Sequence, residues 1–295
     1  MERLTAKDFD PELLGLFDKY VHGDLDRRGF LDGAGKFAVG TTTAVMLLDM
    51  LSPKFAEAQV VPKDDKRIKT EWVEIDSPAG SGKIKAYVAK PANATGKLPT
   101  VLVIHENRGL NPHIEDIARR LAVDNFLAVA PDALTALGGY PGDEDKAREL
   151  FPKLDQAKIR EDFIAATNYA RKRPDSTGKI GAVGFCYGGG VVNMLATKVP
   201  ELLAGVPFYG GAPPDADVKN IKAAMLINHA GNDKRLVDGY PAFDAAMTAA
   251  GVRHEGFIYP GVEHGFNNDT TPRFDAAAAK LAWERTVAHF KKYLS

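Results

Sequence analysis

The only cysteine of the 295-residue chain, Cys186, lies in a segment that is typical of a nucleophile. It follows the apolar run 179–185 within the pattern G-F-C-Y-G-G, so that Gly184 and Gly188 lie two residues before and after it. A tight turn from a strand into a helix needs glycine at both positions, because larger side chains would collide there. The positive end of the helix dipole would favour the thiolate, and the main-chain N–H of Tyr187 would stabilise an oxyanion. A lone cysteine at a strand end can instead be a small core residue, so the pattern needs partners.

An acid and a histidine follow Cys186 in the order that a nucleophile–acid–base triad requires. Asp233 stands in A-G-N-D after the apolar run 223–230, and His264 stands in E-H-G-F after the run 254–260. His264 would take the thiol proton and later protonate the leaving group, while Asp233 would fix the tautomer of the imidazole. We therefore expect these three side chains to form a catalytic triad.

Several other side chains compete for these roles. His229, His254 and Asp238 lie close to the same strands and are alternatives for the base or the acid. His264 is preferred because E-H-G-F places it in a tight loop before the last helix. Three further histidines are interpreted as surface or capping residues: His22, His113 and His289.

The elements that would carry these residues alternate between strands and helices. Two runs with alternating apolar and polar residues, 70–78 and 83–91, predict an antiparallel hairpin. Short continuous apolar runs predict strands that are buried on both faces: 98–105, 125–131, 179–185, 204–210, 223–230 and 254–260. Segments with helical spacing lie between them: 114–122, 159–172, 189–198, 241–250 and 275–294. We expect an α/β fold with a mostly parallel central sheet, helices on both faces and an N-terminal antiparallel hairpin.

Four segments resemble those of the dienelactone hydrolase (carboxymethylenebutenolidase) family of α/β-hydrolases. They are G-F-C-Y-G-G, A-G-N-D, P-G-V-E-H-G-F and the loop H-E-N-R-G-L-N, and the resemblance extends over residues 70–295. It implies the α/β-hydrolase fold and a carboxylic ester hydrolase that cleaves small esters or lactones through a thioester on Cys186. It implies neither a cofactor nor a metal. The resemblance is closest to the branch whose N-terminus carries a twin-arginine motif.

The resemblance also implies roles for the loop after the third strand. Glu106 corresponds to a buried glutamate that sits beside the cysteine and helps to activate it, and a carboxylate there could act as a second base. A solvated loop glutamate is the alternative. The main-chain N–H of Asn107 would be the second oxyanion donor, together with that of Tyr187.

The residues for substrate binding depart from the family's pattern. The family binds a substrate carboxylate with two arginines, but Ala136 and Asn268 stand at those positions in this chain. Arg108 could supply a replacement cation, because charge-assisted pairs with carboxylates are strong. It could equally form a surface pair with Glu106. Tyr140, in the loop G-G-Y-P-G-D-E-D, is a candidate for a lid over the pocket.

The composition excludes several classes of protein. With 38 basic and 39 acidic residues the formal net charge is −1, and no block of one sign suggests a nucleic-acid-binding surface. One cysteine cannot form an intramolecular disulfide, nor a thiolate metal site without several other ligands. We expect a small-molecule ester or lactone as the partner, no nucleic acid, no cofactor, no stable membrane span, and a monomer or small homo-oligomer.

The segment 1–58 is expected to be an N-terminal extension of the domain. Its residues 24–31, D-L-D-R-R-G-F-L, resemble a twin-arginine export signal, which would continue in the apolar run 37–51 and a cleavage pattern A-E-A. Asp49 interrupts the apolar run, which is too short to span a membrane comfortably. The mature α/β-hydrolase domain would then be 59–295, in the periplasm or otherwise exported. The alternative is a helical extension packed on the domain or on a partner subunit, in a cytoplasmic protein.

Two alternative functions use the same cysteine segment. A thioesterase or a peptidase would employ the same triad on another acyl group. A catalytically silent thiol sensor or ligand-binding protein would use Cys186 as a low-pKa thiol at a helix start. A sensor needs neither a general base nor an elbow, so turnover of an activated ester separates the enzymes from the sensor.

Overall fold

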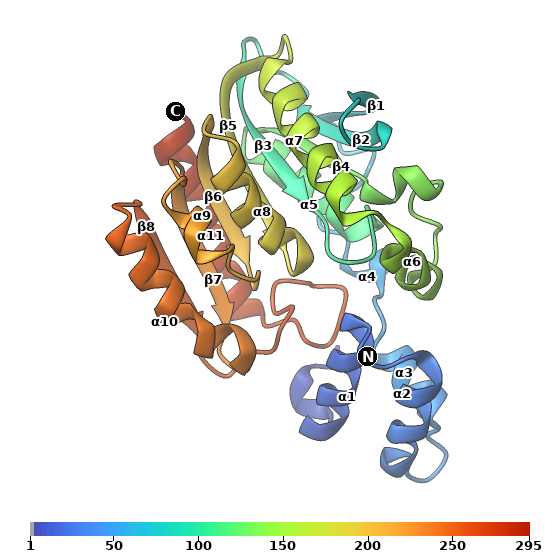
Figure 1. Ribbon diagram of the computed structural model, residues 1–295. Coiled ribbons are helices and arrows are strands. Elements are labelled where there is room, and N and C mark those ends of the chain that lie inside the picture. The colour runs from blue at the N-terminus through green and yellow to red at the C-terminus, as the bar shows by residue number, and fades with distance from the viewer. Residues whose placement is uncertain (1–2) are drawn as a thin grey trace.

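The apolar runs form one eight-stranded sheet in the computed structural model, which describes residues 3–295 (Figure 1). The strand order is β1-β2-β4-β3-β5-β6-β7-β8. Strand β2 pairs antiparallel with β1 and with β4, and all other neighbours pair parallel. The predicted hairpin and the six buried strands are confirmed, with these bounds: β1 (Ile68–Ser77), β2 (Gly82–Pro91), β3 (Leu98–Ile104), β4 (Leu127–Pro131), β5 (Ser176–Phe185), β6 (Leu202–Phe208), β7 (Ala224–Ala230) and β8 (His254–Tyr259).

Helices cover both faces of the sheet, as Figure 1 shows. The apolar core on one face includes side chains of three helices: α7 (Gln156–Lys172), α8 (Tyr187–Lys198) and α10 (Lys234–Ala249). The core on the other face includes side chains of α5 (Pro112–Val123) and α11 (Ala276–Leu294). Shorter helices complete this part: η3 (Ala133–Leu137), α6 (Glu144–Leu150), η4 (Phe151–Lys153) and α9 (Asp215–Val218). The α/β-hydrolase fold expected from the sequence is therefore present.

The residues at the starts of these helices differ in whether their side chains cap the helix. Asn111 and Asp275 accept hydrogen bonds from main-chain N–H groups in the first turns of α5 and α11, which is the usual way to start a helix. Asp233 does the same for α10, so this acid is also a cap. Cys186 stands at the start of α8 and its side chain makes no capping bond. Its sulfur is therefore available for other partners.

Residues 3–58, which we call the helical cap, form a separate cluster of helices with its own apolar core. The helices are η1 (Ala6–Asp8), α1 (Pro11–His22), α2 (Arg27–Ala34), η2 (Gly35–Phe37), α3 (Ala44–Leu51) and α4 (Phe55–Ala58). Its core contains Leu13, Phe17, Phe30, Leu48 and Leu51, all nearly inaccessible to solvent. The apolar run 37–51 does not form one helix, because α3 begins only at residue 44. None of the helices described for residues 3–295 combines the length and the apolar character that a membrane crossing needs.

The helical cap packs on the rest of the chain, which we call the body (residues 59–295). Tyr20 donates its hydroxyl proton to Asp145 of α6, and Arg27 forms an ion pair of 2.6 Å with the same carboxylate. Arg148 lies over the ring of Tyr20, 4.4 Å from its centroid. The main-chain N–H of Lys54 donates to a carbonyl of the loop before α11. In the described part of the chain, the helical extension thus packs on its own domain.

Candidate active site

Cys186 lies at a strained turn between β5 and α8. Its backbone has φ 54° and ψ −113°, a conformation that residues with a side chain rarely adopt. A Cβ on Gly184 would lie 2.2 Å from the carbonyl oxygen of Gly188, and a Cβ on Gly188 would lie 2.4 Å from that of Ile104. Only glycine fits at either position, as expected from the pattern. The turn presents the thiol at the carboxyl edge of the sheet.

His264 and Asp233 form a hydrogen-bonded pair beside this turn. Asp233 follows β7, His264 lies in the loop after β8, and their Oδ2 and Nδ1 atoms are 2.6 Å apart. The His264 ring is 6% exposed, and its other nitrogen, Nε2, is buried without a hydrogen-bond partner within the described residues. One nitrogen of this ring lies within 4.8 Å of the Cys186 sulfur. The carboxylate occupies Nδ1, so Nε2 is the nitrogen free to exchange a proton with the thiol.

Charge around the thiol shifts the pKa values of both groups. Burial alone would raise the pKa of Cys186, but the positive charge of His264 and a hydrogen bond from His22 outweigh it and lower this pKa to about 6. Burial alone would lower the pKa of His264, but the thiolate and the hydrogen bond to Asp233 raise it to about 9. The low dielectric of a buried site strengthens these interactions. A thiolate beside an imidazolium is therefore the favoured state near neutral pH.

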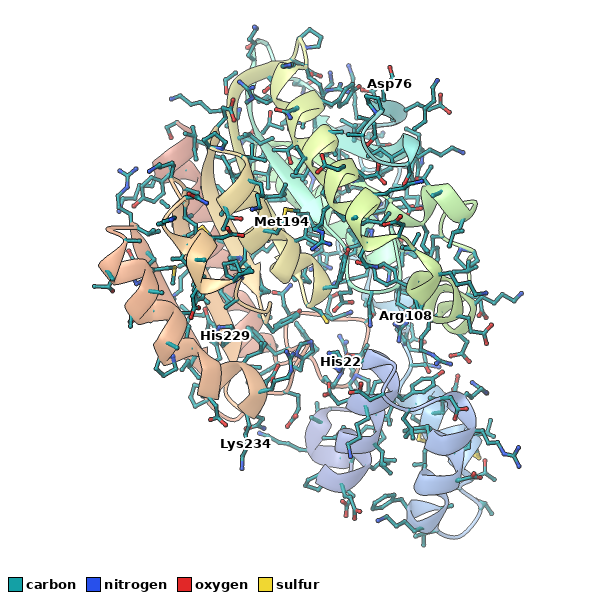
Figure 2. The ribbon with its side chains drawn as sticks, viewed as in Figure 1. His22, Asp76, Arg108, Met194, His229 and Lys234 are labelled. Atoms are coloured by element: carbon teal, nitrogen blue, oxygen red, sulfur yellow. The ribbon has the colours of Figure 1, made fainter. Side chains whose placement is uncertain are left out.

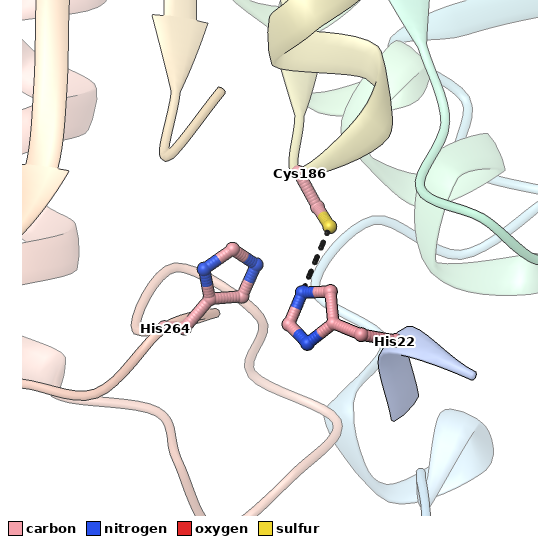
Figure 3. Close-up of side chains that lie close together, drawn as sticks. All are labelled: His22, Cys186 and His264. Carbon is pink, nitrogen blue, oxygen red and sulfur yellow. Dashed lines mark hydrogen bonds between the residues drawn. The ribbon is translucent and has the colours of Figure 1, made fainter. Parts of the chain in front are cut away.

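A second histidine, His22, reaches the same sulfur from the helical cap. Its Nε2 atom lies 3.6 Å from Cys186 Sγ, as the dashed line in Figure 3 marks. Its ring meets that of His264 edge to face, with 4.7 Å between the centroids. The interpretation of His22 as a surface or capping residue is wrong. The contact joins two residues that are 164 positions apart in the sequence, so no local sequence pattern could predict it.

Four other histidines and the competing acid are not among the residues that line the cavity around Cys186. Ring nitrogens of His113 and His289 contact Asp269 and the carbonyl of Ala224. His113 is buried rather than a surface residue. Ring nitrogens of His254 contact Asp244 and a main-chain carbonyl. The remaining two are His229, whose buried ring packs on Tyr240, and Asp238, which is exposed on α10.

The loop after β3 carries three of the predicted site residues, Glu106, Asn107 and Arg108. Glu106 accepts a hydrogen bond of 3.1 Å from the side chain of Asn268, one of the two positions where an arginine was expected. Asn107 and Arg108 line the same cavity as Cys186. Arg108 is buried and lies 4.0 Å from Glu144, so the alternative of a surface pair with Glu106 is not what the structure contains.

Tyr140 lies in a different environment from the one expected for a lid. Its hydroxyl donates to Glu144 over 2.9 Å, its main-chain N–H donates to Asp132, and its side chain packs on the core. It does not belong to the residues that line the cavity around Cys186. Ala136, the other position without its arginine, is exposed and also outside this cavity. The cover over the cavity comes instead from the helical cap.

The cavity around Cys186 has a volume of about 1880 Å³ and lies between the cap and the body. Its walls include residues from α1 of the cap, the loop after β3, the start of α8 and the loops after β6, β7 and β8. Figure 2 shows His22 and Arg108 near the junction of the two parts. A small-molecule ligand would fit in such a space, since ligand pockets commonly measure about 300–1,000 Å³.

Two further cavity residues have features that the sequence did not reveal. Tyr209, just after β6, has φ 38°, a buried hydroxyl without a partner in the described residues, and a ring centroid 4.8 Å from that of His264. Arg273 is 6% exposed, with its guanidinium 3.4 Å from Asp18 and 5.2 Å from the ring centroid of Phe17. Strain and an unpaired polar group often mark a functional position. Neither feature leaves a mark in the sequence.

The thiol and the two imidazoles are also the only such group of potential metal ligands within residues 3–295. One nitrogen of each of His22 and His264 and the sulfur of Cys186 all lie within 4.8 Å of one another. A zinc ion could contact all three. A metal site needs neither a strained elbow nor a helix N-terminus behind the sulfur, whereas a nucleophile needs both. The cluster therefore fits a nucleophile between two imidazoles better than a metal site.

Known proteins resemble both parts of the chain. The sequence profile of the Dienelactone hydrolase family matches residues 84–294, and a profile described as YqhI-like matches residues 1–38. The "Putative carboxymethylenebutenolidase" of Escherichia coli K12 is 30% identical over 249 residues, which make up 79% of this chain and 91% of that protein. The "Putative hydrolase fragment YghX" of the same bacterium is 50% identical over 113 residues, 38% of this chain and 97% of that protein. The crystal structure of a "Putative Dienelactone Hydrolase" from Klebsiella pneumoniae has a TM-score of 0.68 at 29% identity and covers 76% of this chain and 100% of that one.

Proposed function

This chain belongs to the dienelactone hydrolase family, whose members are carboxylic ester hydrolases, and we propose that it cleaves small esters or lactones through a thioester on Cys186. One observation carries the proposal. Cys186 stands at a strained turn with the hydrogen-bonded pair His264–Asp233 beside it. This is the arrangement of a nucleophile, a base and an orienting acid.

In the proposed first step the Cys186 thiolate attacks the carbonyl carbon of the ester. The oxyanion accepts hydrogen bonds from the main-chain N–H groups of Tyr187 and Asn107. Tyr187 is the first residue of α8, where N–H groups lack partners within the helix. Protonated His264 gives its Nε2 proton to the departing alkoxide, which leaves as an alcohol. The products of this step are the thioester and a neutral His264.

In the second step water releases the acid. Neutral His264 takes a proton from a water molecule, and the resulting hydroxide attacks the thioester carbonyl. The C–S bond breaks and Cys186 leaves as a thiolate, while His264 is again protonated. Asp233 holds the imidazole through Nδ1 during both transfers. We propose that Glu106 acts as an additional base near the thiol, with its carboxylate oriented by Asn268.

The choice of substrate depends on the cations around the cavity. Neither Ala136 nor Asn268 can bind a substrate carboxylate as an arginine would. Arg108 is buried, lines the cavity and belongs to the loop that would bind the oxyanion. We propose that it recognises an acidic group of the substrate. We assign no role in substrate binding to Tyr140, because its hydroxyl donates to Glu144 and it does not line the cavity.

The direct test compares p-nitrophenyl acetate and a dienelactone as substrates for the wild type and for Cys186→Ala. We expect the wild type to hydrolyse the activated ester and the variant to be inactive. The dienelactone rate reports how far Arg108 replaces the two missing arginines. Equal turnover by wild type and variant would contradict the thioester mechanism.

The runner-up function is a thiol sensor, and the lowered pKa of Cys186, about 6, is the observation that favours it. A sensor would be oxidised rapidly at Cys186 and would hydrolyse neither substrate. A thioesterase or peptidase would cleave thioesters or peptides faster than oxygen esters. The same pair of proteins, tested on each type of substrate, separates these functions.

Export by the twin-arginine route stays a prediction. The paired arginines, Arg27 and Arg28, lie at the exposed start of α2. Cleavage after Ala58 would remove every residue of the helical cap, including His22. The N-terminal sequence of the protein from its own host therefore decides between a removable signal and a permanent cap. A monomer or small homo-oligomer is likewise a prediction, which the mass in solution tests.

A further inference from the structure

The helical cap reaches the reactive thiol as well as covering it. We propose that the cap supplies a second catalytic histidine: His22, oriented by Asp18, contributes a positive charge that holds Cys186 as a thiolate while His264 moves protons. This inference rests on the proposed thiol hydrolase function. It makes the helical cap, residues 3–58, part of the active site.

The contacts of His22 suit an imidazolium. It is the last residue of α1, where the negative end of the helix dipole favours a cation. Its Nδ1 lies 2.8 Å from the carbonyl oxygen of Asp18 and 3.3 Å from the carboxylate of the same residue. Its Nε2 lies 3.6 Å from the sulfur of Cys186. A carbonyl oxygen can only accept, so Nδ1 carries a proton; in the protonated ring a second proton, on Nε2, faces the thiolate.

The charged groups around His22 come from both the cap and the body. Asp18 on the cap and Cys186 on the body favour the positive charge, whereas His264 on the body opposes it. Arg273, from the loop before α11, lies 3.4 Å from the carboxylate of Asp18, so Asp18 interacts with both His22 and Arg273. Burial alone would lower the pKa of His22, but the hydrogen bonds and charges of Asp18 and Cys186 raise it to about 10. Together these groups favour a His22 side chain that stays positively charged at neutral pH.

The body fixes the position of His22 through the residue before it. The carbonyl oxygen of Val21 accepts hydrogen bonds from the side chains of Asn107 and Arg108, both over 2.9 Å. These two residues belong to the loop that would bind the oxyanion. Tyr20, one residue earlier, is bonded to Asp145. Three consecutive residues of the cap are thus attached to the body, which gives the imidazole a defined place opposite His264.

The two histidines then have different roles in the reaction. His22 keeps both of its protons throughout and lowers the free energy of the thiolate, both as attacking group and as leaving group. His264 gives one proton to the alcohol and takes one from water, so it ends each cycle as it began. Ester and water are converted to alcohol and acid without any other reactant. His22 contacts the reacting sulfur and is catalytic in this sense, whereas Asp18 is a positioning residue.

The test uses the full-length chain and measures the rate of Cys186 alkylation by iodoacetamide as a function of pH. Since the chain has one cysteine, the rate reports that thiolate alone. In His22→Gln we expect the midpoint of the titration to rise by about one to three pH units, because a positive charge near the sulfur is lost. Asp18→Asn should move it the same way by less. Lys19→Gln, which removes an exposed positive charge from the same helix, should leave it unchanged.

The outcomes separate this inference from the proposed function. If wild type hydrolyses esters but His22→Gln keeps the wild-type midpoint, the role of His22 is wrong and the thiol hydrolase stands. If the midpoint rises but wild type hydrolyses no ester, the contact is real and the proposed function fails. Limited proteolysis of each variant shows whether the cap is still docked, and a docked His22→Gln with an unchanged midpoint overturns the proposal. Assays with EDTA exclude a bound divalent ion as the source of the shift.

Discussion

Asn268 donates its side-chain amide to the carboxylate of Glu106 over 3.1 Å. Its side-chain oxygen, Oδ1, accepts from the main-chain N–H and the hydroxyl of Thr270, so both ends of the amide are hydrogen-bonded. The residue that replaces an expected arginine has therefore become a support for the glutamate beside the active site. It holds Glu106 by a hydrogen bond from a neutral amide.

Asn268→Asp should destabilise the fold in a pH-dependent way. Two carboxylates would lie side by side, so the folded state raises the pKa of one of them, and stability falls as the pH rises through that value. We expect a loss of about 1–3 kcal/mol in the free energy of unfolding at pH 8 and a smaller loss at pH 5. Urea unfolding at both pH values measures this. Equal stability of variant and wild type at pH 8 would contradict the contact.

Asp233→Asn should lower kcat by a factor of about 10² to 10⁴, because an amide can hold the imidazole in the wrong tautomer and cannot stabilise its positive charge. The measurement is the steady-state hydrolysis of p-nitrophenyl acetate. Asp238→Asn is the matched control, since this exposed aspartate lies on the same helix, α10. A loss of activity in the control equal to that in Asp233→Asn would contradict the assignment of the acid.

The pH profile of kcat/KM should be bell-shaped. Activity rises through about pH 6 as Cys186 loses its proton, and it falls above about pH 9 as His264 loses the proton that the leaving group requires. Initial rates with a soluble ester over this range measure both limbs. In Cys186→Ser the acidic limb should follow the ionisation of His264 instead of the thiol, because a serine hydroxyl must give its proton to a neutral histidine. A wild-type profile without a limb near pH 6 would contradict the resting thiolate.

Arg108→Ala should change the preference between substrates more than the activity itself. We expect the ratio of kcat/KM for an ester with a free carboxylate to that for a neutral ester to fall at least about tenfold, since a charge-assisted contact is lost. The ratio matters because Arg108 also binds Val21 next to His22, so both rates can fall together. An unchanged ratio would exclude Arg108 as the cation that binds the substrate.

The body of the fold could be predicted because its signals are local. Continuous apolar runs give buried strands, and the glycines around Cys186 follow from the close approach of Gly184 to Gly188. The three motifs also share one edge of the sheet, because the loops after parallel strands meet there. This is why Cys186, Asp233 and His264 could be chosen from the sequence before any distance was known.

The helical cap could not be placed from the sequence, because its role depends on a long-range contact. The same apolar residues fit an export signal and a small helical core, and the structure packs Phe17 and Phe30 in such a core. His22 carries no local pattern that links it to Cys186. The conformation of Tyr209 is equally hidden, since a positive φ at a residue other than glycine results from tertiary packing.

The most direct test of the central claim is to detect the acyl-enzyme. Full-length wild type is mixed with p-nitrophenyl acetate, quenched with acid within the first turnover, digested and analysed by mass spectrometry. We expect one acetyl group on the peptide that contains Cys186, and none in Cys186→Ala. Rapid release of p-nitrophenol by wild type with no acetylated peptide, or with the acetyl group on another residue, would contradict Cys186 as the nucleophile.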